Sequence, residues 1–237
     1  MSGKKHLSRL AAPRTWPIER KKSKWISKPS PGPHNIRNSL PLNVVLRDIL
    51  NHVKNRKETK YVLNNKNILI NGIARKDYNF SVGIFDILEI PKLNEQYLVI
   101  FNTKGKISVK HIDKSNANLK VSKIIGKTKI KGGKIQINLF DGNNYLLDKN
   151  NYNVGDSLVI DLANRKIKTH LPLEKGCFIY LVGGSNVGNI GKVKEIINSK
   201  DLQKPKIIFE LDGKEHKTLK DYAFVIGKDK PIIEIKK

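Results

Sequence analysis

The sequence predicts an α+β protein that is mostly β. It would combine an extended basic N-terminal arm, a small helix-helix-hairpin module and two further β domains. Three patterns predict this. Positive charge and proline dominate the first segment, apolar residues recur at helical spacing only between about residues 42 and 65, and short alternating runs separated by turns fill the rest. We expect the boundaries to fall at residues 1–40, 41–91, 92–173 and 174–237.

The N-terminal arm is the most strongly charged segment. Residues 1–37 carry ten lysines and arginines against one acidic residue, Glu19, and hold five of the ten prolines. Prolines remove amide donors and the charges oppose burial, so we expect neither a helix bundle nor a sheet here without a partner. Both tryptophans, Trp16 and Trp25, lie in this segment. We therefore expect them to be buried against a partner rather than within the chain.

The module at residues 41–91 is predicted to run helix, helix, strands. An apolar stripe from Leu42 to Val53 predicts a first helix at about 42–54, and the stretch "RKETKYVLNN" predicts a second at about 57–65, with Tyr61 and Val62 inward. The pair Asn71-Gly72 tolerates positive φ and predicts a hairpin turn after Ile68-Leu69-Ile70.

Strands account for the remainder. The runs "QYLVIF", "KISVKHI", "KIQINLF", "NYLLD", "SLVIDL" and "RKIKTHL" recur at spacings near ten residues, which predicts a central β-barrel or sandwich. A further set, "GCFIYLV", "KIIFELDG", "HKTLKDYAFVIG" and "PIIEIKK", predicts a second small β-barrel from residue 174 onward.

The net charge of +25 points to a polyanionic partner, with nucleic acid first. Neither a membrane-spanning run nor a signal peptide is apparent, so we expect a cytoplasmic protein. Cys177 is the single cysteine, the six histidines show no metal-ligand spacing, and no nucleophile motif occurs. We therefore expect no enzyme activity, no cofactor, no metal, no membrane partner and no small-molecule substrate.

Basic and aromatic side chains of the first 76 residues are the candidate RNA contacts. Indole rings can stack on unpaired bases while cations bind phosphates; the alternative is a disordered, solubilising segment. We favour RNA binding. The candidates are Lys4, Lys5, Arg9, Arg14, Trp16, Arg20, Lys21, Lys22, Lys24, Trp25, Lys28, Arg37, Arg47, Lys54, Arg56, Lys57, Arg75 and Lys76.

The stretch "GGSNVGNIGK" has the glycine spacing of a phosphate-binding loop. Asn189 replaces the required lysine, however, and Ile190 the required hydroxyl, so that interpretation fails. Two interpretations stay open: a glycine-rich corner that a nucleic-acid backbone or another protein approaches closely, or a tight turn without a ligand.

Taken in order, these phrases resemble a known family. "KKHLSRLAAPRTWPI", "GPHNIRNSLPLNVVLRDIL", "ILINGIARKDYNFSVGIFDILEI", "VGGSNVGNIGKV" and "FVIGKDKP" are similar to small-subunit ribosomal protein four of the archaeal and eukaryotic type. The resemblance implies that the C-terminal domain is a KOW-type, SH3-like barrel and that the module binds RNA. It also assigns roles to three groups of residues: His6, Arg9, Pro13 and Trp16 to an N-terminal signature, Asn71 and Gly72 to the RNA-binding hairpin, and Gly183, Gly184, Asn186, Gly188 and Gly191 to the KOW loop.

The family implies a structural constituent of the small ribosomal subunit, with ribosomal RNA and neighbouring small-subunit proteins as partners. Two alternatives stay open. One is an RNA-modifying enzyme, similar to a pseudouridine synthase, that shares the helix-helix-hairpin module. The other is a KOW-type transcription factor.

Overall fold

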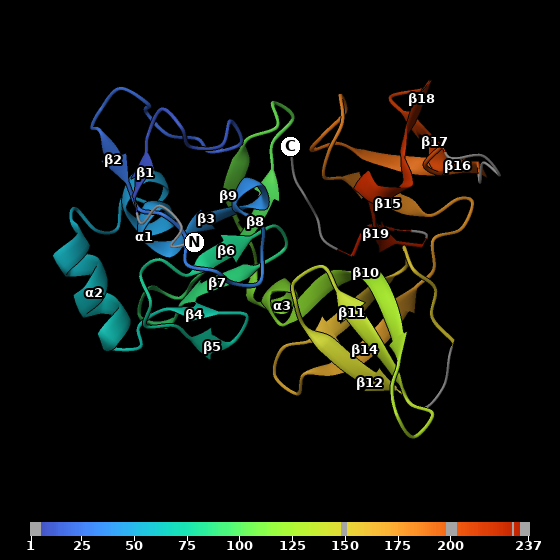
Figure 1. Cartoon of the computed structure of the whole chain (residues 1–237), viewed down its shortest axis with the longest axis horizontal. Helices are drawn as coiled ribbons and strands as arrows, with labels where there is room; N and C mark the ends of the chain where they lie inside the picture. Colours follow the sequence, from blue (N-terminus) through green and yellow to red (C-terminus); the bar gives the residue numbers. More distant parts are fainter. Residues whose placement is uncertain (1–5, 148–150, 198–202, 229, 233–237) are drawn as a thin grey trace. The chain divides into compact units, whose positions relative to one another are not determined.

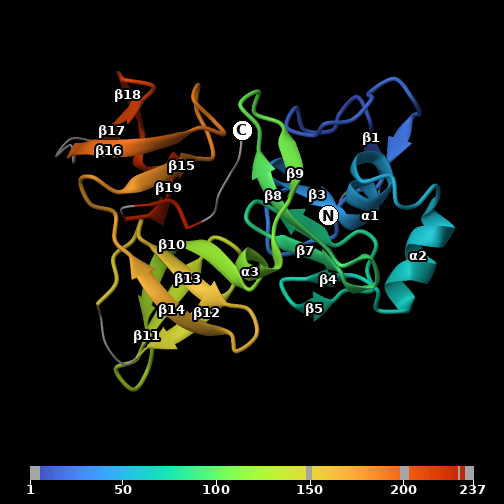
Figure 2. The same cartoon turned by 180° about the vertical axis from the view of Figure 1, so that it is seen from behind.

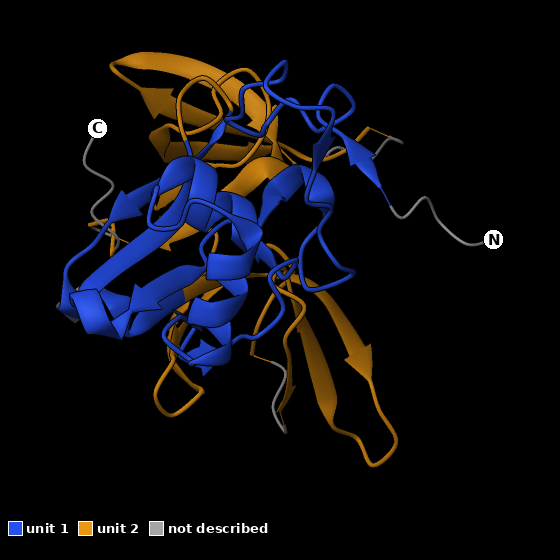
Figure 3. Cartoon of the chain, turned by 90° about the vertical axis from the view of Figure 1, so that its left-hand side faces the viewer, with its two compact units in different colours: residues 1–101, 106–120 blue, residues 102–105, 121–237 orange. Residues whose placement is uncertain are grey.

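The computed structural model describes residues 6–147, 151–197, 203–228 and 230–232. The chain divides into two compact units (Figure 3): unit 1 comprises residues 1–101 and 106–120, and unit 2 comprises residues 102–105 and 121–237. Strands far outnumber helices in the described residues, which confirms the mostly β prediction. Within these residues, no helix is long and apolar enough to cross a membrane. Lys4 and Lys5 lie outside the described residues.

The N-terminal segment folds within unit 1, contrary to expectation. Strand β1 (Leu7–Ser8) pairs antiparallel with β2 (Trp25–Ile26). A 3₁₀ turn, η1 (Ile36–Asn38), leads into β3 (Ser39–Pro41), which pairs with β6 (Ser81–Gly83). The prediction that no sheet could form here without a partner is therefore wrong.

The two predicted helices are present, but the first is shorter than expected. Helix α1 (Leu42–Val44) continues as a π-helical turn, η2 (Val45–Ile49), and the chain leaves the helix at Asn51, whose φ is +55°. Helix α2 (Arg56–Asn64) begins at Asn55, whose side chain caps the Glu58 amide. Its buried face consists of Thr59 and Leu63, so Tyr61, 70% exposed, does not point inward as predicted.

A five-stranded antiparallel sheet completes unit 1 in the order β5-β4-β7-β8-β9 (Figure 1). Strands β4 (Leu69–Ile70) and β5 (Ile73–Ala74) confirm the predicted hairpin, with Asn71 and Gly72 both at positive φ. Strand β7 (Ile87–Ile90) pairs with β8 (Glu95–Phe101) across a 3₁₀ turn, η3 (Pro91–Leu93). The expected boundary at residues 91 and 92 thus falls inside this sheet. Figure 2 shows β8 beside β9 (Ile107–His111), which precedes α3 (Lys114–Ala117).

The described residues of unit 2 form two five-stranded sheets. The first has the order β12-β11-β10-β13-β14, from β10 (Leu119–Lys129), β11 (Ile135–Leu139), β12 (Asn144–Leu147), β13 (Ser157–Asp161) and β14 (Lys166–Leu171). The second has the order β18-β17-β16-β15-β19, from β15 (Phe178–Leu181), β16 (Ile190–Ile197), β17 (Lys206–Leu211), β18 (Lys214–Leu219) and β19 (Ala223–Gly227), with a 3₁₀ turn, η4 (Lys220–Tyr222), before β19.

Apolar side chains hold the two sheets of unit 2. Ile124, Ile137 and Leu158 belong to the buried cluster of the first sheet. The Phe140 ring meets the Phe224 ring edge-on at 5.0 Å between centroids, which links this sheet to β19 of the second. Most of these strands coincide with the predicted runs. Strand β10 is the one in the first sheet that no predicted run covers.

Candidate nucleic-acid interface

Trp16 is an internal residue of unit 1. Its side chain is 1% exposed, and its indole Nε1–H donates to the Ile36 carbonyl at 3.1 Å. The neighbouring Thr15 hydroxyl donates to the Arg37 carbonyl at 2.7 Å. The expectation that both tryptophans are buried only against a partner is therefore wrong for Trp16, because residues 36 and 37 of its own chain fold back onto it.

Two arginines of the N-terminal segment are also used internally. The Arg20 guanidinium donates to the carbonyls of Ala12 at 2.9 Å and Pro13 at 2.8 Å. Arg9 is 3% exposed and donates to the Glu19 carbonyl at 2.7 Å. Guanidinium groups that bind main-chain carbonyls replace the hydrogen bonds missing from an irregular loop. These cations thus hold the segment folded, a role that their charge alone did not indicate.

Trp25 differs from Trp16, because its side chain remains 52% exposed. The His6 ring lies 5.5 Å away between centroids, and the Lys24 ammonium lies 5.2 Å from the indole centroid. Other predicted RNA contacts in this segment are also exposed: Arg14, Lys21, Lys22, Lys24 and Arg37. Lys28 is half-buried.

A pocket of about 480 Å³ opens beside Trp25. We call it the Trp25 pocket; its charged lining residues are Arg9, Lys22, Arg47, Asp48 and Lys54. Arg47 binds both oxygens of Asp48, at 3.0 and 2.8 Å, and Arg9 approaches the same carboxylate at 3.5 Å. The hydrogen bond to Asp48 raises the pKa of the Arg47 guanidinium. Four cations against one carboxylate leave the pocket positive.

A second group of cations lies on aromatic rings near the start of β6. The Arg56 guanidinium lies 4.2 Å from the centroid of the Tyr78 ring and also donates to the Tyr78 hydroxyl. The Arg75 guanidinium lies 4.5 Å from the Phe80 centroid. Such contacts fix the direction of a guanidinium while leaving charge at the surface. Charge in the sequence indicated the two arginines but not Tyr78 and Phe80, whose one signal is that they lie within four residues of Lys76. Lys54, Lys57 and Lys76 are exposed.

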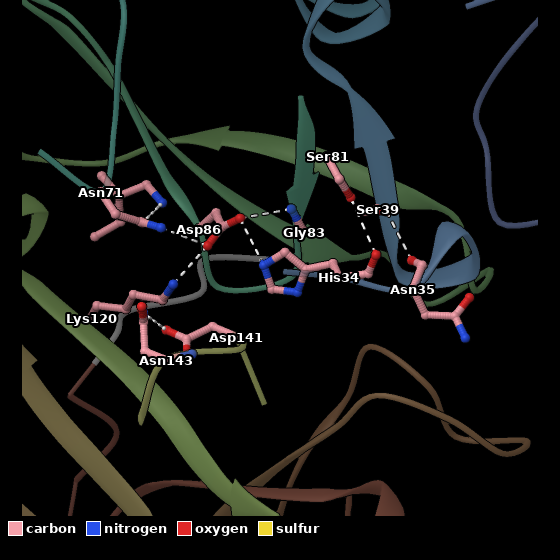
Figure 4. A network of polar contacts seen from close by, with 11 residues as sticks. His34, Asn35, Ser39, Asn71, Ser81, Gly83, Asp86, Lys120, Asp141 and Asn143 are labelled. Atoms are coloured by element: carbon pink, nitrogen blue, oxygen red, sulfur yellow. Dashed lines mark hydrogen bonds and ion pairs between the residues drawn. The ribbon is translucent and has the colours of Figure 1, made fainter. Parts of the chain in front are cut away.

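A buried carboxylate, Asp86, organises the hairpin (Figure 4). Its Oδ1 accepts from Asn71 Nδ2 at 2.8 Å and from Lys120 Nζ at 2.7 Å, and its Oδ2 accepts from the Gly83 amide at 2.8 Å. His34 Nε2 lies 2.9 Å from Oδ2. Burial alone would raise the pKa of Asp86, but attraction by Lys120 and His34 outweighs it and holds that pKa well below its ordinary value.

Asn71 therefore stabilises the hairpin itself. Besides contacting Asp86, its side-chain oxygen accepts from the Ile87 amide at 2.9 Å. Gly72, next to it at the hairpin tip, is exposed. Of the two hairpin residues that the resemblance assigns to RNA binding, Gly72 is exposed and Asn71 is half-buried.

The glycine-rich loop joins β15 to β16 and packs on its own unit. The Gly188 amide donates to Leu181 O at 2.8 Å, and a Cβ at Gly188, where φ is +81°, would lie 2.4 Å from the Asn102 carbonyl oxygen. A Cβ at Gly183 would lie 2.7 Å from the Tyr222 ring, and one at Gly191 would lie 2.5 Å from Phe209. These close approaches within the chain favour the tight-turn interpretation. Gly184 and Asn186 belong to the same turn, where Asn186 O accepts from the Asn189 amide.

Comparison with known proteins agrees with this architecture. A model described as "RS4NT (NUC023) domain" matches residues 1–37, and one described as "Ribosomal family S4e" matches residues 93–167. Among the described residues, no three His, Cys, Asp or Glu side chains gather as a metal site.

The similarity to individual proteins spans nearly the whole chain. The small ribosomal subunit protein eS4 of Methanothermobacter thermautotrophicus is 42% identical over 99% of this chain and 97% of its own length. The protein of the same name from Archaeoglobus fulgidus is 40% identical over 97% of each chain. The crystal structure of 30S ribosomal protein S4e from Thermoplasma acidophilum has a TM-score of 0.71 at 26% identity, covering 83% of this chain and 99% of that one. The chain belongs to the ribosomal S4e family.

Proposed function

We propose that the chain is a structural protein of the small ribosomal subunit and binds ribosomal RNA through the basic surface of unit 1. The observation that carries this proposal is the full-length similarity to proteins named as small ribosomal subunit proteins. The net charge of +25 suits a phosphate-rich partner. Neighbouring small-subunit proteins would be the further partners, and the chain would act without catalysis.

Within unit 1, exposure separates the cations that can bind phosphate from those that hold the fold. Lys21, Lys22 and Lys24 are exposed and follow one another in the strand-connecting loop before β2. Arg56 and Arg75 lie on aromatic rings, which orients each guanidinium. We place the RNA contacts on these side chains, with Arg9 and Trp16 supporting the loop from inside.

Full-length similarity also favours this function over the two alternatives. An RNA-modifying enzyme would be expected to add a catalytic domain to the helix-helix-hairpin module, yet the relatives of this chain match it over 97% of their own length. A KOW-type transcription factor would not need the exposed basic loop of unit 1.

The decisive experiment is a sucrose gradient of a cell lysate at low and high salt. We expect the protein in the small-subunit peak at low salt and its release as salt rises, because counterion release weakens phosphate binding. Its absence from that peak at low salt would contradict the proposal.

A matched pair of variants tests the surface itself. Changing Lys21, Lys22 and Lys24 together to Gln should flatten the log-log salt dependence of RNA affinity by up to about 0.9 per lost phosphate contact. The control changes Lys166, Lys168 and Lys175, three exposed lysines of unit 2, to Gln. Equal flattening by both triple variants would show that net charge, and not the unit 1 surface, determines binding.

A further inference from the structure

The Trp25 pocket combines an exposed aromatic ring with a positive rim. Trp25 is 52% exposed although the other tryptophan of the chain is buried, and leaving apolar surface in water forgoes about 25 cal/mol per Å². A pocket of about 480 Å³ lies beside it. That volume is within the roughly 300–1,000 Å³ usual for small-ligand pockets. An aromatic face at such a pocket is suited to a flat, stackable ligand.

The charges of the pocket select an anion. Asp48 is the single carboxylate of the lining, and both of its oxygens are already bound by Arg47. Lys22 and Lys54 line the same pocket and are exposed. Glu19, outside the lining, lies 3.7 Å from the Lys22 ammonium, but both side chains are exposed, so this pair is weak. The lining keeps a net positive charge, so the flat ligand should carry a phosphate or an equivalent anion.

One buried donor of the pocket is unsatisfied. The Arg9 side chain is 4% exposed, and its Nε–H has no hydrogen-bond partner, whereas its other nitrogens bind Glu19 and Asp48. An unpaired buried donor is costly, and because Arg9 lines the pocket, a ligand oxygen that reached its Nε would be bound favourably. This third feature is independent of the exposed ring and of the rim charge, and it too calls for an acceptor.

We propose that the Trp25 pocket binds one unpaired nucleotide of RNA, with the base stacked on Trp25 and the phosphate held by the cationic rim. The proposal rests on the RNA-binding function proposed above and deepens it. Paired bases are already stacked within a duplex, so only an unpaired nucleotide can place its face on the indole. The pocket thus makes this part of the protein selective for a loop, bulge or end of the RNA.

Tryptophan fluorescence of the full-length protein tests the proposal directly. The chain has two tryptophans, and only Trp25 is exposed, so quenching by an added ligand reports on the pocket. We expect a single-stranded RNA octamer to quench the emission and the same octamer within a duplex to leave it unchanged. Equal quenching by the duplex, or by a hexaglutamate peptide at the same concentration, would overturn the proposal.

Substitutions give the second readout. Trp25→Ala should weaken octamer binding roughly tenfold, and Trp25→Phe should retain most of the affinity, because a phenyl ring still stacks. Tyr61→Ala is the matched control, since Tyr61 is a 70% exposed aromatic residue outside the pocket, and it should bind like the wild type. Unchanged octamer affinity in Trp25→Ala, with a thermal unfolding transition only slightly below that of the wild type, would refute the pocket.

The two proposals can fail separately. If the wild type co-sediments with the small subunit but Trp25→Ala binds the octamer normally, the pocket is refuted and the ribosomal function stands. If the wild type binds the octamer through Trp25 but is absent from the small-subunit peak, the ribosomal function is refuted and the pocket stands.

Discussion

Trp16 and Trp25 lie nine residues apart in one basic segment, yet their surroundings are opposite. Trp16 is 1% exposed and hydrogen-bonded to Ile36, whereas Trp25 is 52% exposed beside a positive pocket. The cations divide in the same way. Arg20 binds carbonyls of its own loop, and Lys21, next to it, is exposed. Charge in this segment therefore serves two tasks, folding the loop and presenting it to a partner.

The largest effect should come from removing the buried indole. Trp16→Ala should destabilise unit 1 by about 3–5 kcal/mol, because it leaves a cavity and removes the hydrogen bond to Ile36. Urea unfolding followed by circular dichroism measures this. A decrease in the free energy of unfolding below about 1 kcal/mol would mean that the N-terminal segment detaches from unit 1 at little cost. Burial of Trp16 would then not distinguish it in stability from the exposed Trp25.

The second largest effect on stability should come from Asp86, which contacts His34 of the N-terminal segment. Asp86→Asn leaves Lys120 buried without its carboxylate, which should cost about 3 kcal/mol. The pKa of Asp86 lies below its unfolded value of about 3.9. Its stabilisation is therefore complete above that pH and is lost as the pH falls. The stability gap between wild type and variant should shrink below about pH 4, and a gap independent of pH would contradict this. Asp113→Asn, at an exposed position, is the control.

A smaller effect is expected at Arg20. Arg20→Gln removes the guanidinium that binds the Ala12 and Pro13 carbonyls and should cost about 2 kcal/mol. Arg14→Gln removes the same charge from an exposed position of the same segment and should change stability by less than about 0.5 kcal/mol. Equal losses in thermal unfolding would show that charge, rather than the carbonyl contacts, matters.

The smallest effect on stability should be that of Trp25→Ala. Because its indole is half exposed, its removal should lower the free energy of unfolding by about 1 kcal/mol, well below the loss for Trp16→Ala. The measurement is urea unfolding of Trp25→Ala and Trp16→Ala under the same conditions. A loss as large as that of Trp16→Ala would show that Trp25 is a structural residue.

Local patterns predicted most of the sheet structure. The pair Asn71-Gly72 predicted the hairpin because both residues tolerate the positive φ that the turn needs. Alternating apolar runs predicted most strands of unit 2. Strand β10 escaped detection because Lys120 and Lys123, 2% and 6% exposed, are lysines at buried positions. The first helix ended early because Asn51 takes a left-handed conformation that the apolar stripe does not reveal.

Long-range contacts account for what the sequence could not predict. The composition of the N-terminal segment gives its total charge but not the role of each basic residue. Nothing in the local sequence distinguishes Arg20, which binds main-chain carbonyls, from the exposed Arg14. The basic residues of the candidate interface were predicted one by one. The Trp25 pocket was not, because it requires Arg47 and Asp48 to lie beside Trp25, and that proximity follows only from the fold.

The Asp86 network has a consequence for the order of events during synthesis. During translation, Asp86 is added to the chain 34 residues before Lys120, the cation that neutralises it. Translation at about 5–20 residues per second separates the two by seconds. Of its partners among the described residues, the carboxylate then has His34, Asn71 and the Gly83 amide but not Lys120, so its buried charge gains its last partner only when about half of the chain has been made.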